Sequence, residues 1–482
     1  MTTVQTHRFW HHPWLFRLAC AGAVISLTNV FSLPMAFSQF GGAFLGAYLL
    51  AHLFIALPIL VSELLMGRRG RQSAPLSINQ LAAEAFVSRQ WRYLGVVIVV
   101  TGMAIATYYL AFASWALDYA WLVWTQQLPD NELGLRFVLA ELLADPVKLI
   151  ILHSILCVVV VLLLALPSAR GILVPVATMA LLLLLGVAIL SLQAIGTLRW
   201  WDGLQHVLSV RSDGLTWAMW SSAVALSFYS LGVGLGISVL LGVHMDARTS
   251  VSGTATWIVL VDVCWSVFFA GAVFAFVTPE VGTDALTLLF ITLPAAVVQS
   301  GLAEANTWLM IFFGVLLLSG LSTGLFLVKG LVIWLHERFS LRRGFAAGVA
   351  GFILWVGGVG VLLSFNRWRE VRFYGATVFE WLSVLPGTVL LPIIAFLTAI
   401  FVGWVLPNHL VIDELRPLYE YRYAVWRFAL KFLTTVALVL LLVVQVGAEW
   451  SVSGWLQGAI LASMMLLLLL WARLKAMFWN LL

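Results

Sequence analysis

The chain has 482 residues, of which 62% are hydrophobic and only 10% are charged, and its mean hydropathy is +1.04. An average soluble domain carries roughly 25% charged residues, so this composition excludes a soluble enzyme, a disordered scaffold and a nucleic-acid binder. The net charge of +5 comes from basic residues in short loops between apolar runs, where Lys and Arg indicate membrane topology.

Apolar runs long enough to cross a bilayer recur along the whole chain. A spanning helix needs about 20 apolar residues. Because no long polar stretch separates the runs, we predict a single membrane domain, an all-α polytopic protein of about 12 transmembrane helices. The predicted spans are 14–40, 43–67, 93–125, 147–166, 171–196, 216–242, 252–278, 306–335, 344–365, 374–405, 424–447 and 453–478.

Basic residues are more frequent in the loops on the same side as the N-terminus, such as 68–71 and 338–343. The positive-inside rule therefore places both termini in the cytoplasm. The segment 366–373, NRWREVRF, runs against this trend. We expect an integral protein of the plasma (inner) membrane.

Two connections are longer than simple turns. The stretch 70–92 resembles an amphipathic cytoplasmic helix at the membrane interface. The stretch 284–301 is apolar, too short to span and interrupted by Pro294, so we expect an extracellular helical hairpin that dips towards the core as a lid.

Two of the predicted spans contain features that weaken a helix at mid-depth. The first span has the polar residues Ser26, Thr28 and Asn29, followed by Pro34. The sixth span has Gly232, Gly234 and Gly236, and each glycine costs up to about 1 kcal/mol of helix stability. Unwound backbone is tolerated in a bilayer only where it faces protein or a water-filled cavity. Paired breaks five helices apart indicate an inverted-repeat transporter with a midplane site. For the sixth span alone, the alternative is a Gly-x-x-x-Gly packing face.

The order and spacing of several short motifs resemble the neurotransmitter:sodium symporter family. The resemblance runs from Trp10 to about residue 447. Its motifs, in chain order, are Gly22, Asn29 and Pro34 in the first span, GGAF (41–44), ELLMGR (63–68), YY (108–109), SW (114–115), SLGVG (230–234), LFITLP (289–294) and SGLST (319–323).

This resemblance implies a leucine-transporter-like (LeuT-like) fold, an inverted 5+5 repeat with broken helices 1 and 6. Repeat one would cover 14–196, repeat two 216–405, and accessory helices 424–478. The implied activity is sodium-driven symport of an amino acid or related small zwitterion by alternating access. A membrane enzyme is not expected, because the sequence shows no nucleophile–base set or metal-ligand motif near mid-membrane.

The resemblance also implies sodium as the coupling ion. The positions that match the family's second sodium site can all supply an oxygen, as a backbone carbonyl or a hydroxyl: Gly22, Ile25, Ser319, Ser322 and Thr323. The alternative is that the last two hydroxyls merely bond back to their own helix.

The family's first sodium site is only partly matched. Asn29 fits a ligand position, but an ungapped alignment places Phe228 and Leu260 where side-chain ligands are expected. Neither side chain can bind sodium, so we expect coupling to one sodium ion. Asp262, two positions beyond Leu260, is a candidate to titrate in its place.

The implied substrate site lies beside the first break. Amides near Leu27 and Thr28 would meet a substrate carboxylate, with the Tyr109 hydroxyl as a further donor, and Ser230 would receive an amine. The family's lid phenylalanine falls on Ser227, unless Phe228 takes that role through a one-residue shift. The matching lining residues are Val24, Ile105, Val233, Thr323 and Leu327.

The gates match the family unevenly. The outer-gate Arg of the family is Ser32 here, although its acidic partner is present as Glu380. On the inner side Glu337 matches the acidic gate residue, and Arg8 and Trp10 match the N-terminal Arg and Trp. Because the outer gate differs from the family pattern, the resemblance does not predict which substrate is bound.

Ionisable residues inside predicted spans are functional candidates by default. Glu63 matches an acidic residue of the family's second helix. Lys329 lies six residues past Thr323, and we expect it either to pair with Glu63 or Asp262 or to face a cavity.

Two other functions stay open on the same scaffold. A proton-coupled or uncoupled transporter would use Asp262, Lys329 or Glu380 and would respond to pH without sodium. A non-transporting sensor or partner subunit would bind without transport. The expected partners are a small-molecule substrate, a sodium ion and the lipid bilayer, with no nucleic acid.

Overall fold

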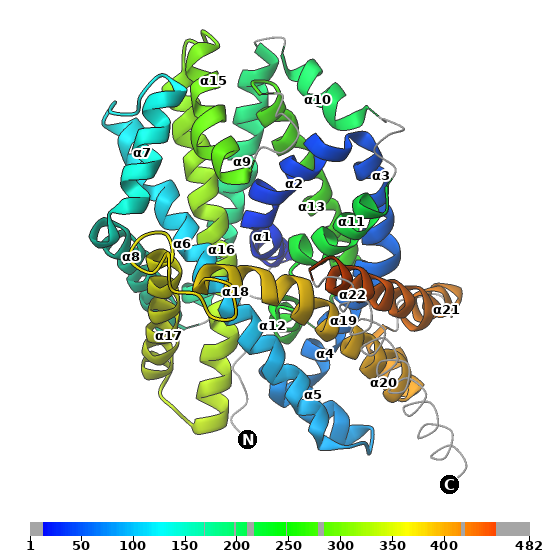
Figure 1. Ribbon diagram of the computed structural model, residues 1–482. Coiled ribbons are helices and arrows are strands. Elements are labelled where there is room, and N and C mark those ends of the chain that lie inside the picture. Colours follow the sequence, from blue (N-terminus) through cyan, green and yellow to red (C-terminus); the bar gives the residue numbers. More distant parts are fainter. Residues whose placement is uncertain are drawn as a thin grey trace.

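The computed structural model describes residues 13–167, 169–196, 199–209, 216–246, 248–277, 284–415 and 420–449. Within this part of the chain the regular structure is helical, apart from one isolated bridge between Phe373 and Ala376. Nine of the described helices are long and apolar enough to cross a membrane, and a tenth span is a bent pair of helices. The prediction of an all-α polytopic membrane protein is therefore confirmed (Figure 1).

The predicted spans coincide with helices up to residue 449, and the predicted span 453–478 lies outside the described residues. π-Helical turns join several of these helices, among them His52–Ala56 between α3 and α4. The helices that match the predicted spans, apart from the two broken ones, are α3 (Gly42–Ala51) with α4 (Leu57–Gly70), α6 (Arg92–Trp124), α8 (Pro146–Ala165), α9 (Val174–Gly196), α13 (Val251–Phe274), α16 (Ala305–Phe339), α17 (Arg343–Leu363), α18 (Val378–Leu385) with α19 (Leu391–Ile400), and α21 (Glu420–Phe428) with α22 (Thr435–Glu449).

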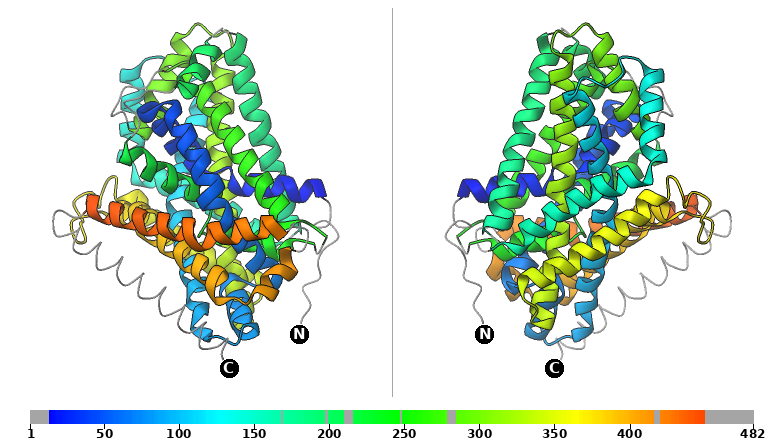
Figure 2. Two further views of the ribbon diagram at one scale, coloured as in Figure 1. Left: turned by 90° about the vertical axis from the view of Figure 1, so that its right-hand side faces the viewer. Right: turned by 90° about the vertical axis from the view of Figure 1, so that its left-hand side faces the viewer.

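The first predicted break is present. Helices α1 (Pro13–Val24) and α2 (Leu27–Phe40) meet at 57° and leave the break in different directions (Figure 2). Ser26 has extended backbone, with φ −115° and ψ 170°, so it ends one helix and caps the next. Pro34 lies inside α2, which shows that the polar residues mark the break.

The second break separates α11 (Trp217–Leu231) from α12 (Ile237–His244). Gly232, Gly234 and Gly236 have φ values of +63°, +80° and +79°. This left-handed region is accessible to glycine at no steric cost, whereas a Cβ would be strained there. The glycines therefore unwind the helix, and the packing-face alternative does not describe them.

Both breaks are enclosed by unbroken helices. The long helices α6 and α16 pack along each other, α1 packs against α9, and α12 packs against α4. Helix α2 contacts α11, α13 and α16. The first break thus faces α16 on one side and α11 with α13 on the other.

The two long connections lie at opposite ends of the bundle (Figure 1). The predicted helix in 70–92 is α5 (Ala74–Glu84), at the same end as α20 (Asn408–Leu415); α10 (Trp200–Leu208) lies at the other end. The predicted hairpin at 284–301 is instead a continuous helix: α14 (Ala285–Thr287), a π-helical turn (Leu288–Thr292) and α15 (Leu293–Gln299). The wider π-helical turn precedes Pro294 and accommodates it without a break.

Candidate functional site

Two hydroxyl groups of α16 face the first break. Ser322 Oγ donates to the Gly22 carbonyl at 2.6 Å, and Thr323 Oγ1 donates to the Ile25 carbonyl at 3.3 Å. Both side chains are buried. These hydroxyls therefore reach across to the broken helix, and the alternative that they bond back to α16 does not hold.

Ser319 lies one turn earlier on α16. Its hydroxyl donates to the Leu316 carbonyl at 2.9 Å, so its own contribution to a cation site would be its backbone carbonyl. Gly22 allows the close approach of α1 to α9, because a Cβ at this position would lie 2.7 Å from the Val176 carbonyl oxygen. The structure thus gathers neutral oxygens at the break, and unwound backbone carbonyls of this kind coordinate sodium in transporters with broken helices.

On its other side, the break is capped by its own side chains. Thr28 N donates to Ser26 Oγ at 3.2 Å. Ser26 N and Ser26 Oγ both donate to Asn29 Oδ1, at 3.1 and 2.9 Å. The amide oxygen of Asn29, which the resemblance places at the first sodium site, is therefore already occupied by two donors.

A buried carboxylate completes this side of the break. Asn29 Nδ2 donates to Asp262 Oδ1 at 2.7 Å and to Ser266 Oγ at 3.0 Å. Tyr48 OH and His52 Nε2 lie 2.9 and 3.1 Å from Asp262 Oδ2. We call these five residues the Asp262 network; it joins the first break to the second and seventh helices, and all of its members are buried.

The structure corrects the alignment of the seventh helix. Leu260, predicted to face the first sodium site, is 56% exposed, whereas Asp262 is fully buried and contacts Asn29. Two positions on an α-helix differ by about 200°, so a two-residue shift exchanges the inner and outer faces. His52 was missed by sequence analysis, although an ionisable residue inside an apolar span is a signal of function.

The predicted substrate residues surround the break. Tyr109 OH lies 2.6 Å from Thr28 Oγ1. Ser227 donates to the Val224 carbonyl at 2.7 Å, and Ser230 Oγ lies 2.7 Å from Tyr48 OH, so Ser230 faces the Asp262 network. The apolar positions predicted to line the site are all buried: Val24, Leu27, Ile105, Phe228, Val233 and Leu327.

Aromatic rings occupy the outer side of the site. Phe31, next to Ser32, stacks on Phe112 with ring centroids 5.3 Å apart, and Phe112 contacts Phe379 at 5.7 Å. Glu380 is exposed and accepts from Thr377 N at 2.6 Å, capping α18. The predicted gate carboxylate therefore serves a helix end, and rings fill the space between these helices.

The inner side is held by a different set of polar contacts. Glu337 accepts from Ser73 N at 2.8 Å, while Arg8 and Trp10 lie outside the described residues. Arg68 pairs with Glu414 at 2.6 Å and donates to the Thr249 carbonyl. Arg68 is the last residue of the ELLMGR motif, but Glu414 lies 346 residues further along the chain, so the pair was not predictable from the sequence.

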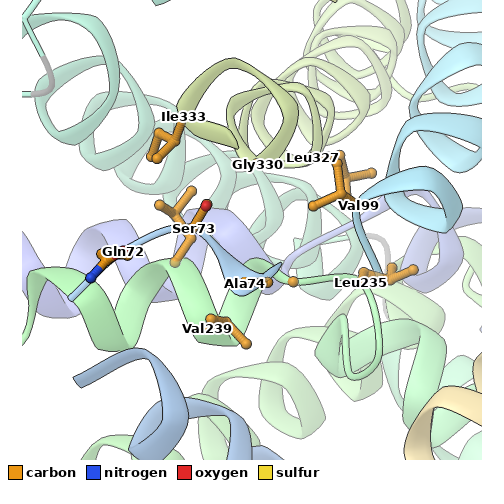
Figure 3. A pocket seen from close by; sticks show the side chains of 11 residues that line it. Gln72, Ser73, Ala74, Val99, Leu235, Val239, Leu327, Gly330 and Ile333 are labelled. Carbon is orange, nitrogen blue, oxygen red and sulfur yellow. The ribbon is translucent and has the colours of Figure 1, made fainter. Parts of the chain in front are cut away.

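Of the two alternatives for Lys329, pairing with Glu63 or Asp262 is not seen in the part of the chain that the structure describes. Glu63 Oε1 accepts from Gly234 N at 2.7 Å, a donor released by the second break. Lys329 is buried, and its predicted partners Glu63 and Asp262 both have other contacts. Its neighbour in sequence, Gly330, lines a small cavity together with Ser73, Leu235, Gly236, Leu327 and Ile333, between α16, the second break and the start of α5 (Figure 3).

Polar groups gathered at two opposed helix breaks inside a membrane-spanning bundle define a membrane transporter. The chain matches the sodium:neurotransmitter symporter family over residues 8–142 and 139–459, and it belongs to that family. The predicted resemblance is confirmed, and the family consists of transporters rather than enzymes.

Two curated relatives span almost the whole chain. An uncharacterized sodium-dependent transporter of Haemophilus influenzae is 23% identical over 467 residues, covering 92% of this chain and 99% of that protein. Another, of Bacillus subtilis, is 24% identical over 452 residues, covering 91% and 97%. The crystal structure of MhsT in complex with L-phenylalanine superposes with a TM-score of 0.80 at 23% identity, covering 90% of this chain and 98% of that one. This likeness confirms the LeuT-like fold.

Proposed function

We propose that this protein is a sodium-coupled symporter of an amino acid or related small zwitterion, working by alternating access with one sodium ion. The observation that carries the proposal is the pair of α16 hydroxyls, Ser322 and Thr323, directed at carbonyls of the first break. The relatives are sodium-dependent transporters, and MhsT was crystallised with L-phenylalanine, which supports an amino-acid substrate.

The sodium ion would be held by the carbonyls of Gly22, Ile25 and Ser319 and the hydroxyls of Ser322 and Thr323. Each of the two hydroxyls would turn its lone pairs towards the ion. Because α1 and α16 both supply ligands, bound sodium favours the arrangement in which the two helices are close together.

The substrate would lie beside Tyr109, between the rings of the outer side and the cavity of the inner side. That cavity, below the second break, marks the direction of release once the contacts of Glu337 and Arg68 open. We place this end in the cytoplasm of the cell, with both termini, in agreement with the positive-inside rule.

The test is the melting temperature of the detergent-purified protein in sodium and in choline. Sodium should stabilise the wild type, and Thr323→Val should lose this stabilisation because it removes a ligand without changing the side-chain volume. Ser319→Ala is the matched control, since its carbonyl remains; it should keep the sodium response. Equal melting temperatures of the wild type in sodium and choline would refute sodium coupling.

A second candidate function, proton-coupled transport on the same scaffold, is favoured by one observation. His52 Nε2 and Asp262 Oδ2 lie 3.1 Å apart and both side chains are fully buried. Uptake into vesicles that follows a pH gradient in choline, and is lost in Asp262→Asn, would support this function over sodium coupling.

A further inference from the structure

Two of the groups predicted to bind a substrate carboxylate, the Thr28 amide and the Tyr109 hydroxyl, are engaged by the chain itself. The amide of Thr28 donates to Ser26 Oγ at 3.2 Å, and the amide of Ser26 donates to Asn29 Oδ1 at 3.1 Å. The hydroxyl of Tyr109 lies 2.6 Å from Thr28 Oγ1. Helix N-terminal amides and a hydroxyl are the donors that an anionic group needs, and here each has an oxygen of a neighbouring side chain within hydrogen-bond distance.

These contacts are built into the packed interior. Ser26, Thr28 and Tyr109 are 2%, 6% and 2% exposed. Asn29, which holds the Ser26 amide, is itself fixed by its hydrogen bond to Asp262. A carboxylate therefore reaches the Thr28 amide and Tyr109 by displacing the two hydroxyls, since they occupy the same hydrogen-bonding positions.

Helix α16 packs closely against the first break and the backbone of Tyr109. On α16, a Cβ at Gly320 would lie 3.1 Å from Leu27 Cδ1 and 3.2 Å from the Tyr109 carbonyl oxygen. Helix α16 is thus in close contact with the break and with Tyr109 at the same level.

We propose that Ser26 and Thr28 form a latch, in which their hydroxyls hold the Thr28 amide and the Tyr109 hydroxyl that a substrate carboxylate would otherwise bind. On substrate binding, the carboxylate takes Tyr109 from Thr28 and the Thr28 amide from Ser26. The latch makes these two residues determinants of specificity, because it lowers the affinity only for ligands that carry a carboxylate. This inference rests on the proposed function, an amino-acid symporter.

The test compares two ligands that differ only in the carboxylate. L-phenylalanine and phenethylamine are titrated in sodium against the purified full-length protein, with thermal stabilisation as the readout. Thr28→Val removes the hydroxyl and keeps the branched shape, so it should tighten L-phenylalanine binding about 3- to 10-fold, the worth of one hydrogen bond. Binding of phenethylamine should stay unchanged. Thr28→Ser, which keeps the hydroxyl, is the matched control and should behave as the wild type.

A Tyr109→Phe background distinguishes the latch from a purely structural role of Thr28. In a Tyr109→Phe background the latch has no partner, so Thr28→Val should no longer tighten L-phenylalanine binding. Ser26→Ala provides a second route if Thr28→Val does not fold, and it should also favour the carboxylated ligand.

Equal tightening of both ligands, weaker L-phenylalanine binding in the latch variants, or no gain in binding of any of the twenty amino acids would overturn the latch. The failure of the proposed function has a different signature, the absence of a sodium effect on the melting temperature of the wild type.

Discussion

The two sides of the first helix break use the same backbone for opposite electrostatic purposes. Towards α16, the Gly22 and Ile25 carbonyls meet only hydroxyls, whose lone pairs can turn to a cation. Towards α13, the Asp262 carboxylate accepts from Asn29 Nδ2 and Tyr48 OH and lies 3.1 Å from His52 Nε2, while His52 Nδ1 faces the Tyr48 carbonyl.

The α16 side of the break can therefore bind an exchangeable ion, whereas the α13 side holds a side chain of the protein itself, Asp262. A buried carboxylate is costly unless donors surround it, so the Asp262 network is closed within the protein. Neutral oxygens carry no such cost and leave their charge balance to an ion. The break can therefore supply one exchangeable cation site while being anchored on its other side.

The largest expected effect tests the anchored side. Asp262→Ala removes the oxygens that contact Asn29 Nδ2, Tyr48 OH and His52 Nε2, and each buried polar group that loses such a hydrogen bond costs about 1–3 kcal/mol of the free energy of unfolding. The measurement is the melting temperature in choline, where sodium plays no part. Asp262→Asn keeps an acceptor oxygen and should be milder. If Asp262→Ala melts at the same temperature as the wild type, Asp262 does not anchor the first break.

A smaller effect is expected at the cation side. Gly22→Ala places a Cβ 2.7 Å from the Val176 carbonyl oxygen, so α1 has to move away from α9 at a cost of about 1–3 kcal/mol. The Gly22 carbonyl moves with it, and the sodium-dependent stabilisation should fall. Gly314→Ala on α16, where a Cβ meets nothing within 4 Å, is the control and should keep both stability and sodium response. A Gly22→Ala protein with an unchanged sodium response would show that this carbonyl is not a ligand.

The smallest effect is expected at a carboxylate remote from both sides. Glu380→Ala removes the capping-box acceptor of the Thr377 amide and should cost about 0.5–1 kcal/mol, without changing the response to sodium. Glu380→Gln keeps an acceptor and should match the wild type in melting temperature. A large loss of transport in Glu380→Gln would instead assign this carboxylate to the outer gate.

Features that depend on local chemistry were predictable from the sequence. Three glycines within five residues weaken a helix and favour an unwound segment, and their positive φ angles show that the helix is broken at 232–236. Likewise, Ser322 and Thr323 sit in a short motif whose spacing from the first break is typical of the family, and the structure directs both hydroxyls to that break.

Features that depend on which face of a helix points inward were not predictable. Ungapped spacing selected Leu260, and only the packing of α13 against α2 shows that Asp262 is the residue that faces inward. The pattern Thr377-x-x-Glu380 is a capping-box signal that the sequence does contain, whereas nothing in the sequence indicates that Arg68 meets Glu414 across the fold.

The amino-acid sequence by itself thus determined the solvent, the positions of most helices up to residue 449, and the two points where helices break, because hydrophobicity and backbone freedom are properties of single residues. Tertiary structure decided the partners of each charge, because a hydrogen bond between residues 29 and 262 depends on the rotation and depth of two helices. Those quantities are set by the packing of the whole bundle.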